Sequence, residues 1–371
     1  MPQMPGQMGA EAQFDVRRIM SSKTSIEWTE SSWGTLRGCS RVSPGCMHCY
    51  AEKQAARIIT MERGRGVPEG QGSYDGLLAK GGQWNGTVTF VKEALDAPLR
   101  WRRPRRIFVN SMSDLFHEDV PLNVIDKIFA VMALSYASRV EPHTFQVLTK
   151  RAERMREYLN DPDVVNRIEQ EAKVLRPDQV CHVQSAWPLP NLWLGVSIES
   201  QEQDHRITCL LESPAAVRWL SLEPLLGPVN LHRVRDGELT YNALSKKEGI
   251  AYRGTGIDWV VVGGESGEFA RPMHPDWAES LRKQCAQLNV PFFFKQWGAW
   301  CPRGPESLGH PVVDGVPVMC VTVTGNDRHS TAATGEPTGD VWMNRAGKSR
   351  SGRSLNGVIY DNYPYAPQGT L

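Results

Sequence analysis

Short runs of β-branched and aromatic residues recur along the chain and alternate with segments that have helical periodicity. These runs are apolar throughout, which is typical of strands buried on both faces of a parallel sheet. Six predicted strands span residues 106–114, 145–150, 192–199, 217–223, 259–265 and 291–296, and a seventh is predicted near 26–28.

Helices are predicted between these strands. Apolar residues at i, i+3, i+4 and i+7 from Ile125 to Met132 mark one helix. A second apolar stripe runs from Trp277 to Leu288, with a capping-box spacing of Asp276 and Glu279 at its start. Strands that alternate with helical crossovers predict an α/β fold, a (β/α) barrel or partial TIM-like barrel over residues 22–300.

The two ends of the chain lack this alternation. Residues 1–21 are predicted to be a disordered tail without the apolar core of a signal peptide. Residues 301–371 are predicted to form a Gly/Pro-rich C-terminal extension, irregular over 302–340 and followed by a basic segment. The glycine-rich segment 64–86 is predicted to be a loop that serves as a lid or insertion.

Composition excludes several classes of protein. The 371 residues are 40% apolar with a net charge of +1, so no global field attracts DNA or a membrane. No window approaches the ~18 apolar residues of a membrane span. Of eight cysteines, three are clustered and five scattered, which is no disulfide framework and favours a cytoplasmic protein.

Charged and hydroxylic residues follow the predicted strands. Because the carboxyl ends of barrel strands meet at one mouth, we expect these side chains to form a polar pocket. They are Ser111, Asp114, Thr149, Lys150, Arg151, Ser197, Glu199, Ser221, Glu223, Glu265, Ser266, Lys295 and Gln296.

Cys39, Cys46 and Cys49 lie within eleven residues, and no fourth cysteine follows until Cys181. Three thiolates leave one iron of an iron–sulfur cluster open to a substrate or cofactor. A helix predicted from Tyr50 would present its positive end to these thiolates. A structural zinc site, with His48 as a possible fourth ligand, and a cluster of buried thiols remain alternatives.

Together with the barrel, this cysteine motif resembles the radical S-adenosylmethionine superfamily. More closely, the chain resembles a phage-associated family of unknown function that carries a three-cysteine motif, over about residues 22–364. The matching segments are Ile26-Glu-Trp-Thr-Glu, Gly38-Cys…Gly45-Cys-x-x-Cys-Tyr-Ala-Glu52, Asn110-Ser-Met-Ser-Asp-Leu-Phe-His117, Leu148-Thr-Lys-Arg, Leu194-Gly-Val-Ser-Ile-Glu, Ser221-Leu-Glu-Pro-Leu, Val262-Gly-Gly-Glu-Ser-Gly, Phe294-Lys-Gln-Trp-Gly and Gly347-Lys…Gly352-Arg…Leu355-Asn-Gly357.

The resemblance implies that Cys39, Cys46 and Cys49 hold a 4Fe–4S cluster whose fourth iron binds S-adenosylmethionine. One electron from an external donor would then cleave the sulfonium and yield a 5′-deoxyadenosyl radical. Two features depart from the superfamily's CxxxCxxC pattern. Six residues separate Cys39 from Cys46, and His48 stands where an aromatic residue usually packs on the adenine.

The resemblance also suggests cofactor contacts. Gly263, Gly264 and Glu265 are similar to the superfamily's glycine–glycine–glutamate motif, which binds the methionine amino group, although here the motif ends a later strand. The other candidates are Asn110, Ser111 and Asp114 for the amino group, Ser197 and Glu199 for the ribose, and Lys150 and Arg151 for a carboxylate or phosphate.

The candidate catalytic residues are Glu199, Glu223, Glu265 and Lys295. In one alternative function, a zinc-dependent barrel hydrolase, a carboxylate of this set would be the general base. A second alternative is a non-catalytic nucleic-acid-binding protein with a zinc-stabilised loop.

Arginines favour a nucleotide or nucleic-acid substrate. Five of the seven residues in Arg100–Arg106 are arginines, with Trp101 among them, and the tail adds Arg345, Lys348, Arg350 and Arg353. Basic and aromatic side chains together suit phosphates and bases. The resemblance to a phage-associated family implies modification or repair of a base, and a peptide or small-metabolite substrate remains open.

Overall fold

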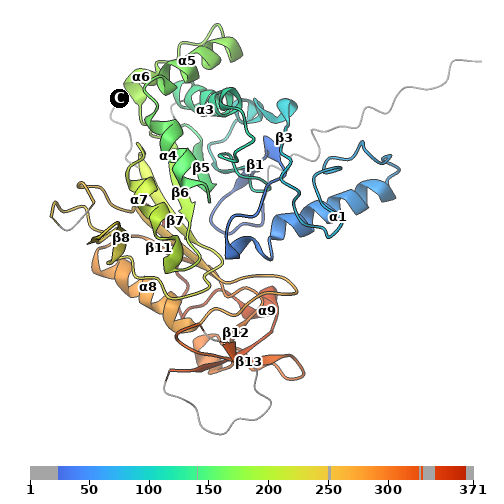
Figure 1. Ribbon diagram of the computed structural model, residues 1–371, viewed down its shortest axis with the longest axis vertical. Coiled ribbons are helices and arrows are strands. Elements are labelled where there is room, and N and C mark those ends of the chain that lie inside the picture. Colours follow the sequence, from blue (N-terminus) through green and yellow to red (C-terminus); the bar gives the residue numbers. More distant parts are fainter. Residues whose placement is uncertain (1–23, 140, 250–251, 326, 329–338, 365–371) are drawn as a thin grey trace, which may run out of the picture.

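A parallel seven-stranded sheet runs through the body of the computed structural model, which describes residues 24–139, 141–249, 252–325, 327–328 and 339–364 (Figure 1). The predicted N-terminal tail, 1–21, lies outside the described residues. The strands are, in spatial order, β1 (Ser31–Trp33), β4 (Arg106–Val109), β5 (Thr144–Thr149), β6 (Leu192–Ser197), β7 (Val217–Leu222), β10 (Trp259–Gly263) and β11 (Phe292–Gln296).

The sheet curls into a half-barrel (Figure 1). Its spatial neighbours follow one another along the chain, and each strand pairs in parallel with the next. Within the described residues β1 and β11 are the two edges and do not pair with each other. The predicted partial barrel is therefore confirmed, and the described strands do not close into a full TIM barrel.

The first predicted strand is misplaced. The strand is Ser31–Trp33, whereas the chain turns near Trp28. Trp28 is 2% exposed and belongs to the core, so its apolar run reflects burial of a loop residue. β4 also ends earlier than predicted, because Asn110 adopts a left-handed backbone with φ of 58°.

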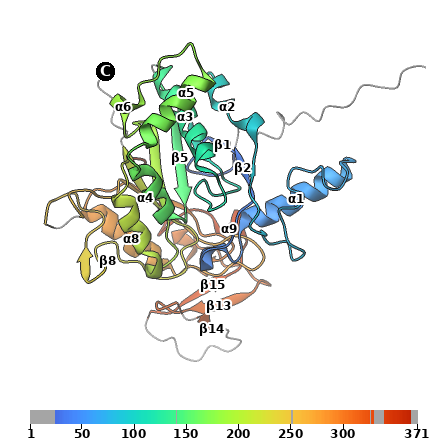
Figure 2. The same cartoon turned by 45° about the horizontal axis from the view of Figure 1, so that its top comes forward.

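Helices cover one face of the sheet (Figure 2). Alternate strand residues, for example Ile107, Val147 and Val260, share a core cluster with Ile125 of the predicted first helix and Leu281 of the second. The helices are α1 (Tyr50–Gly64), α2 (Ala97–Arg100), α3 (Leu122–Ala137), α4 (Ala152–Asn160), α5 (Val164–Leu175), α6 (Val183–Ala186), α7 (His205–Leu211), α8 (Pro275–Gln287) and α9 (Lys348–Ser351).

Both predicted amphipathic helices are present, as α3 and α8, but the start of α8 differs from the prediction. His274 is the N-cap residue, and its Nδ1 accepts a hydrogen bond from the Asp276 backbone N–H at 3.1 Å. Glu279 instead accepts hydrogen bonds from Arg282. The imidazole thus takes the capping role that the spacing of Asp276 and Glu279 suggested.

The concave face of the sheet carries the other set of alternate residues. Phe108, Trp219, Trp259 and Phe293 form a second cluster, and the Trp28 ring packs 4.8 Å from Phe108 and 5.1 Å from Trp219. Further along the same strands this face becomes polar. Because side chains alternate with period two, β4, β6, β7 and β11 each contribute an aromatic residue to this face and a polar one at or just beyond the carboxyl end.

Residues 360–363 close part of the open side. Phe294 N–H donates to the Tyr360 carbonyl at 2.9 Å, which adds the tail to the free edge of β11. The guanidinium of Arg106, at the start of β4, lies 4.0 Å from the centre of the Tyr363 ring, so the tail crosses from β11 to β4.

The C-terminal extension is more regular than predicted. A four-stranded antiparallel sheet is formed by β12 (Cys301–Pro302), β15 (Val341–Asn344), β13 (Val318–Val321) and β14 (Asp327–Arg328), and lies at the lower end of the molecule in Figure 1. Two further pairs are β2 (Leu36–Arg37) with β3 (Thr89–Phe90), and β8 (Val234–Asp236) with β9 (Leu239–Tyr241).

None of the helices in the described part of the chain combines the length and apolar composition needed to cross a bilayer.

The predicted loop after α1 packs back along that helix, where Tyr74, Leu77 and Trp84 contact Ala51 and Ala55.

We expect Gly195→Ala to destabilise the fold, because a Cβ at this position of β6 would lie 2.4 Å from the Trp219 ring. Overpacking of this kind costs about 1–3 kcal/mol in the free energy of unfolding, measurable by urea denaturation. Gly34→Ala is the control, because no atom lies within 4 Å of its added Cβ. Equal stability of the two variants would contradict the packing of Trp219 across the concave face.

Candidate functional site

A pocket of about 390 Å³ lies at the carboxyl ends of the parallel strands, above the aromatic residues of the concave face. Most of the predicted site residues line it. They are Cys39, Cys46, His48, Cys49, Asn110, Ser111, Asp114, Lys150, Arg151, Ser197, Glu223, Gly264, Glu265 and Lys295. Glu199 and Gly263 lie behind this lining. A more open depression of about 670 Å³ beside α8 is lined by none of the predicted site residues.

The three cysteines reach the pocket from one loop between β2 and α1. Cys46 ends a 3₁₀ turn, and Cys49 is the N-cap residue of the predicted helix, α1. Gly38, with φ of +89°, and Gly45 permit the loop's close packing. A Cβ on Gly38 would lie 2.1 Å from the Thr87 carbonyl oxygen, and one on Gly45 would lie 2.4 Å from Glu199.

The thiols lie in unlike electrostatic environments. Burial, reinforced by the Asp114 carboxylate, raises the pKa of Cys39 to about 12. Burial also raises the pKa of Cys49. Burial alone would raise the pKa of Cys46, but the Lys150 ammonium and hydrogen bonds from the backbone of Val42 and Ser43 outweigh it and lower the pKa. Cys46 is therefore the thiol most readily ionised.

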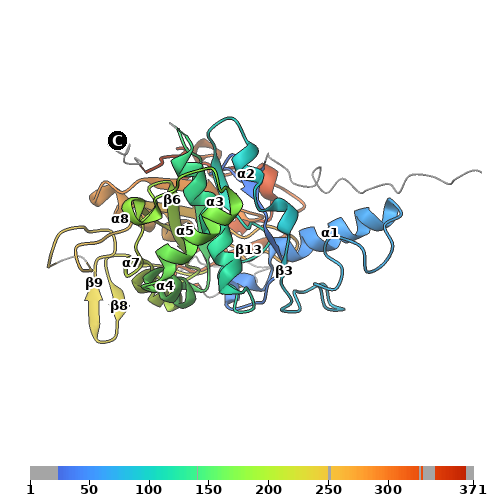
Figure 3. The ribbon, with the colours of Figure 1, turned by 90° about the horizontal axis from the view of Figure 1, so that it is seen from above.

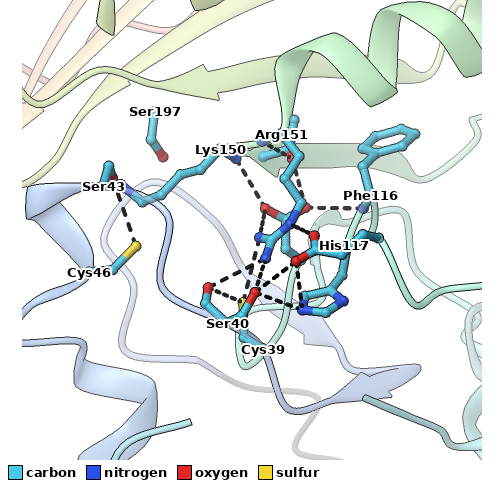
Figure 4. A network of polar contacts seen from close by, with 12 residues as sticks. Cys39, Ser40, Ser43, Cys46, Phe116, His117, Lys150, Arg151 and Ser197 are labelled. Atoms are coloured by element: carbon cyan, nitrogen blue, oxygen red, sulfur yellow. Dashed lines mark hydrogen bonds and ion pairs between the residues drawn. The ribbon is translucent and has the colours of Figure 1, made fainter. Parts of the chain in front are cut away.

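Arg151 organises the polar network beside Cys39 (Figure 4). Its Nη1 lies 3.1 Å from Asp114 Oδ2, its Nε donates to Glu118 at 2.6 Å, and its Nη2 donates to Ser40 Oγ at 2.6 Å. Nη1 also lies 3.7 Å from Cys39 Sγ. The guanidinium is thus held against the cysteine loop and is already paired with carboxylates.

Lys150 is paired as well. Its Nζ contacts Glu199, which also accepts hydrogen bonds from Arg206 Nη1 at 3.1 Å and Ser43 Oγ at 2.7 Å. Burial lowers the pKa of Lys150 to about 8. Glu199 therefore links the cysteine loop to β6 and α7 through buried charge pairs, and Lys150 is the member of this group that faces the pocket.

Asn110 lines the pocket and carries a buried donor without a partner among the described residues. Its Oδ1 accepts hydrogen bonds from the backbone N–H groups of Thr35 and Leu36, at 2.8 and 3.0 Å, which fixes the orientation of the amide. Nδ2 has no hydrogen-bond partner among the described residues. The free atom suits a carboxylate or carbonyl oxygen of a ligand. The amino group predicted from the sequence would need an acceptor, so this pairing does not fit Asn110.

The Gly263-Gly264-Glu265 segment is built for close packing. A Cβ on Gly264 would lie 1.9 Å from the Trp297 carbonyl oxygen, and one on Gly263 would lie 2.7 Å from Glu223 Oε1. Glu265 accepts two hydrogen bonds from the Arg271 guanidinium, at 2.7 and 2.9 Å. Arg271 Nη2 also donates to the Pro44 carbonyl at 3.0 Å and so ties this segment to the cysteine loop.

A second group of polar residues lines the part of the pocket formed by β7 and β11. Lys295 Nζ lies 2.9 Å from Glu223 Oε1, and Trp28 Nε1 donates to Glu223 Oε2 at 3.3 Å. Lys348, from the predicted basic segment, pairs with Glu27 at 3.2 Å and also lines the pocket. The predicted catalytic residues Glu223 and Lys295 are therefore partners of each other.

The arginines of residues 100–106 lie at the other end of the sheet. Arg106 begins β4, whereas Asn110, just beyond its end, lines the pocket. Arg100 pairs with Asp96, and Arg105 lies 5.2 Å from the Trp101 ring centre. This segment is part of the amino-terminal edge, and its charge does not contribute to the pocket.

The sequence did not identify Trp28, Arg206 and Arg271 as site residues. Each makes a contact to a predicted carboxylate, namely Glu223, Glu199 and Glu265. A buried carboxylate requires a cation or several donors, so Glu223, Glu199 and Glu265 imply such partners once they are predicted to be buried. Only the fold identifies which arginine serves which carboxylate.

The described residues contain no group of three or more His, Cys, Asp and Glu side chains arranged to hold a metal ion. The donor chemistry of the cysteine loop nevertheless fits a thiophilic metal group. All three thiols are free, partly exposed and directed to one pocket. The sulfurs of Cys39 and Cys46 make hydrogen-bond contacts of 3.5 Å or longer, so a metal would compete with weak interactions there.

We expect Arg151→Met to lower the free energy of unfolding by about 3–5 kcal/mol, because it leaves the buried Asp114 carboxylate without its cation. Glu118 adds little to this loss, since its side chain is 59% exposed. Urea denaturation of the single variants and of Asp114→Asn/Arg151→Met gives the coupling between the two residues. Additive losses would show that the ion pair is not the source of the effect.

Comparison with known proteins identifies the family. No curated protein matches the chain, and no solved structure matches it. The family model described as "Protein of unknown function (DUF5131)" matches residues 23–364 of the 371. This match includes the cysteine loop, every strand of the half-barrel and the tail that crosses from β11 to β4. The chain therefore belongs to the DUF5131 family.

Proposed function

We propose that the protein is a radical S-adenosylmethionine enzyme that modifies or repairs a nucleobase, free or within a nucleic acid. One observation carries the proposal: three free cysteines on a single loop line one pocket at the carboxyl ends of a parallel half-barrel. The barrel alone supports no function, because the same architecture hosts many reactions. The thiols at this edge of the sheet narrow the range of reactions, since three thiolates can hold an iron–sulfur cluster with one open iron.

In this proposal Cys39, Cys46 and Cys49 would hold a 4Fe–4S cluster, and S-adenosylmethionine would bind beside it. When bound, the cluster and cofactor would supply one-electron cleavage of the sulfonium carbon–sulfur bond, releasing methionine and a 5′-deoxyadenosyl radical able to remove a substrate hydrogen atom. The electron would come from an external reductant.

The chain's own residues would bind and orient the cofactor. Asn110 Nδ2 offers a donor to the cofactor carboxylate, and Ser197 at the end of β6 offers a hydroxyl to the ribose. Arg271 holds the Glu265 segment and the cysteine loop at a fixed separation through its contacts with both. Lys295 and Glu223, 2.9 Å apart, can exchange a proton with a substrate bound near β11.

The proposal is tested by product formation after anaerobic reconstitution with iron and sulfide. Wild-type protein should hold about four irons and release 5′-deoxyadenosine when dithionite and S-adenosylmethionine are added. Cys39→Ala/Cys46→Ala/Cys49→Ala should lose both the iron and the product, because the ligands are gone. Iron analysis and chromatography of the nucleoside products provide the two measurements.

Cys181→Ala/Cys209→Ala is the matched control, since both cysteines are buried and distant in sequence from the loop. It should keep the wild-type iron content and product. Zinc in place of iron, with no cleavage of S-adenosylmethionine, would contradict the proposal and favour a zinc-stabilised loop.

A further inference from the structure

A basic and aromatic surface lies beside the mouth of the pocket. We define it as the rim surface, formed by Met47, His48, Lys53, Arg57 and Phe269. Met47 and Phe269 are 52% and 62% exposed, although both are apolar. Lys53 Nζ lies 5.5 Å from the centre of the Phe269 ring, and the His48 ring lies 6.0 Å from it. An exposed ring with a cation beside it is a stacking site for a flat group.

The exposed side of α1 extends this surface away from the pocket. Lys53 and Arg57 stand one turn apart, are exposed, and have no ion pair among the described residues. The opposite side of α1 is occupied, because Ala51 and Ala55 pack against the loop that carries Trp84. In all three ribbon views α1 projects from the body (Figures 1, 2 and 3). The helix therefore presents unpaired cations along a free edge.

The cations inside the pocket, unlike Lys53 and Arg57, are paired with carboxylates. Every Lys and Arg side chain that lines it is paired with a carboxylate: Lys150 with Glu199, Arg151 with Asp114 and Glu118, Lys295 with Glu223, and Lys348 with Glu27. A phosphate that entered would have to displace one of these carboxylates. The pocket interior thus offers no unpaired cation to a substrate phosphate, whereas the unpaired cations of the rim surface suit one.

Two neutral amides in the pocket lack partners. Gln296 is 8% exposed, and its Oε1 has no hydrogen-bond partner among the described residues, while its Nε2 donates to Ser266. Asn110 is 2% exposed and offers its unpartnered Nδ2. The Asn110 donor is the one assigned above to the cofactor carboxylate, so Gln296 Oε1 is the acceptor left for a substrate donor. The edge of a nucleobase carries such donors, for example an exocyclic amino group.

We propose that the substrate is a single-stranded or locally unpaired nucleic acid. One base enters the pocket, where a donor on its edge meets Gln296 Oε1, and the flanking phosphates lie along Lys53 and Arg57. A neighbouring base stacks on Phe269. Glu268 adds one negative charge to the rim, and Arg345, which donates to the Gly267 carbonyl at 3.3 Å, adds a positive one, so the surface stays net positive. The inference rests on the proposed function for its chemistry, but binding can be tested without it.

The test is fluorescence anisotropy with labelled single-stranded DNA and RNA about 12 nucleotides long, titrated from about 50 to 200 mM salt. Lys53→Ala/Arg57→Ala should weaken binding at least tenfold and reduce the salt slope by about 1.4, the value for two lost phosphate contacts on a single strand. Phe269→Ala should weaken binding about tenfold with an unchanged salt slope, because it removes stacking and no charge.

Arg102→Ala/Arg103→Ala is the matched control. Both arginines are exposed, have no ion pair among the described residues, and lie on the amino-terminal edge. This variant loses the same charge as the rim variant and should bind like wild type. Equal losses of affinity in the two double variants, or no binding of either oligonucleotide, would overturn the proposal. Either result would favour a protein partner for the rim surface.

Entry of the base is tested separately with an oligonucleotide that contains 2-aminopurine, whose fluorescence rises when the base leaves its stack. Wild-type protein should raise the signal, and Gln296→Ala should bind the strand at the rim with a smaller rise. An unchanged signal in wild type would show that no base enters. If 5′-deoxyadenosine still forms while oligonucleotide binding fails, only this inference is wrong.

Discussion

The two-residue period of parallel strands determines the arrangement of the site. Along β7, for example, Trp219, Ser221 and Glu223 alternate with Leu220 and Leu222, and the two sets face opposite sides of the sheet. The first set begins in the aromatic cluster and ends in the pocket. A slip of one residue would place the carboxylate among the helices and an apolar side chain in the pocket. The register therefore fixes both the core and the chemistry.

Charge pairing is the second constraint. Glu199 is 1% exposed, and burial of its carboxylate without partners would strongly destabilise the fold. The fold tolerates it because Lys150, Arg206 and Ser43 contact the carboxylate. The same pairs hold the cysteine loop, since Ser43 belongs to that loop. One set of contacts therefore offsets the electrostatic cost of burying the Glu199 carboxylate and also fixes the position of the cysteine loop. The rim surface, where Lys53 and Arg57 are unpaired, is free to bind a partner's charge.

Most strands and the pocket could be predicted from the sequence because their signals are local. Continuous apolar runs define the strands, and their polar ends must meet in a parallel sheet. The first strand could not be located, since Trp28 is as apolar as a strand residue although it is a buried loop side chain. The small C-terminal sheet was missed because strands such as Cys301–Pro302 are too short to show a period.

The partners of the site residues could not be predicted. Sequence shows that Arg100–Arg106 is basic, but only the fold shows that it lies at the amino-terminal edge, away from the thiols. Similarly, the free atom of Asn110 depends on Thr35 and Leu36, which are distant in sequence. Residue type was therefore a good guide to where polar groups gather, and a poor guide to which of them remain free for a ligand.

In the proposed function, Cys39, Cys46 and Cys49 hold a cluster that S-adenosylmethionine contacts directly. Electron paramagnetic resonance of the reconstituted, dithionite-reduced protein tests this contact without any substrate. We expect the signal of a reduced 4Fe–4S cluster whose g values change when S-adenosylmethionine is added, because the cofactor would bind the open iron. A cluster signal that the cofactor leaves unchanged, or no cluster signal at all, would contradict the proposed function.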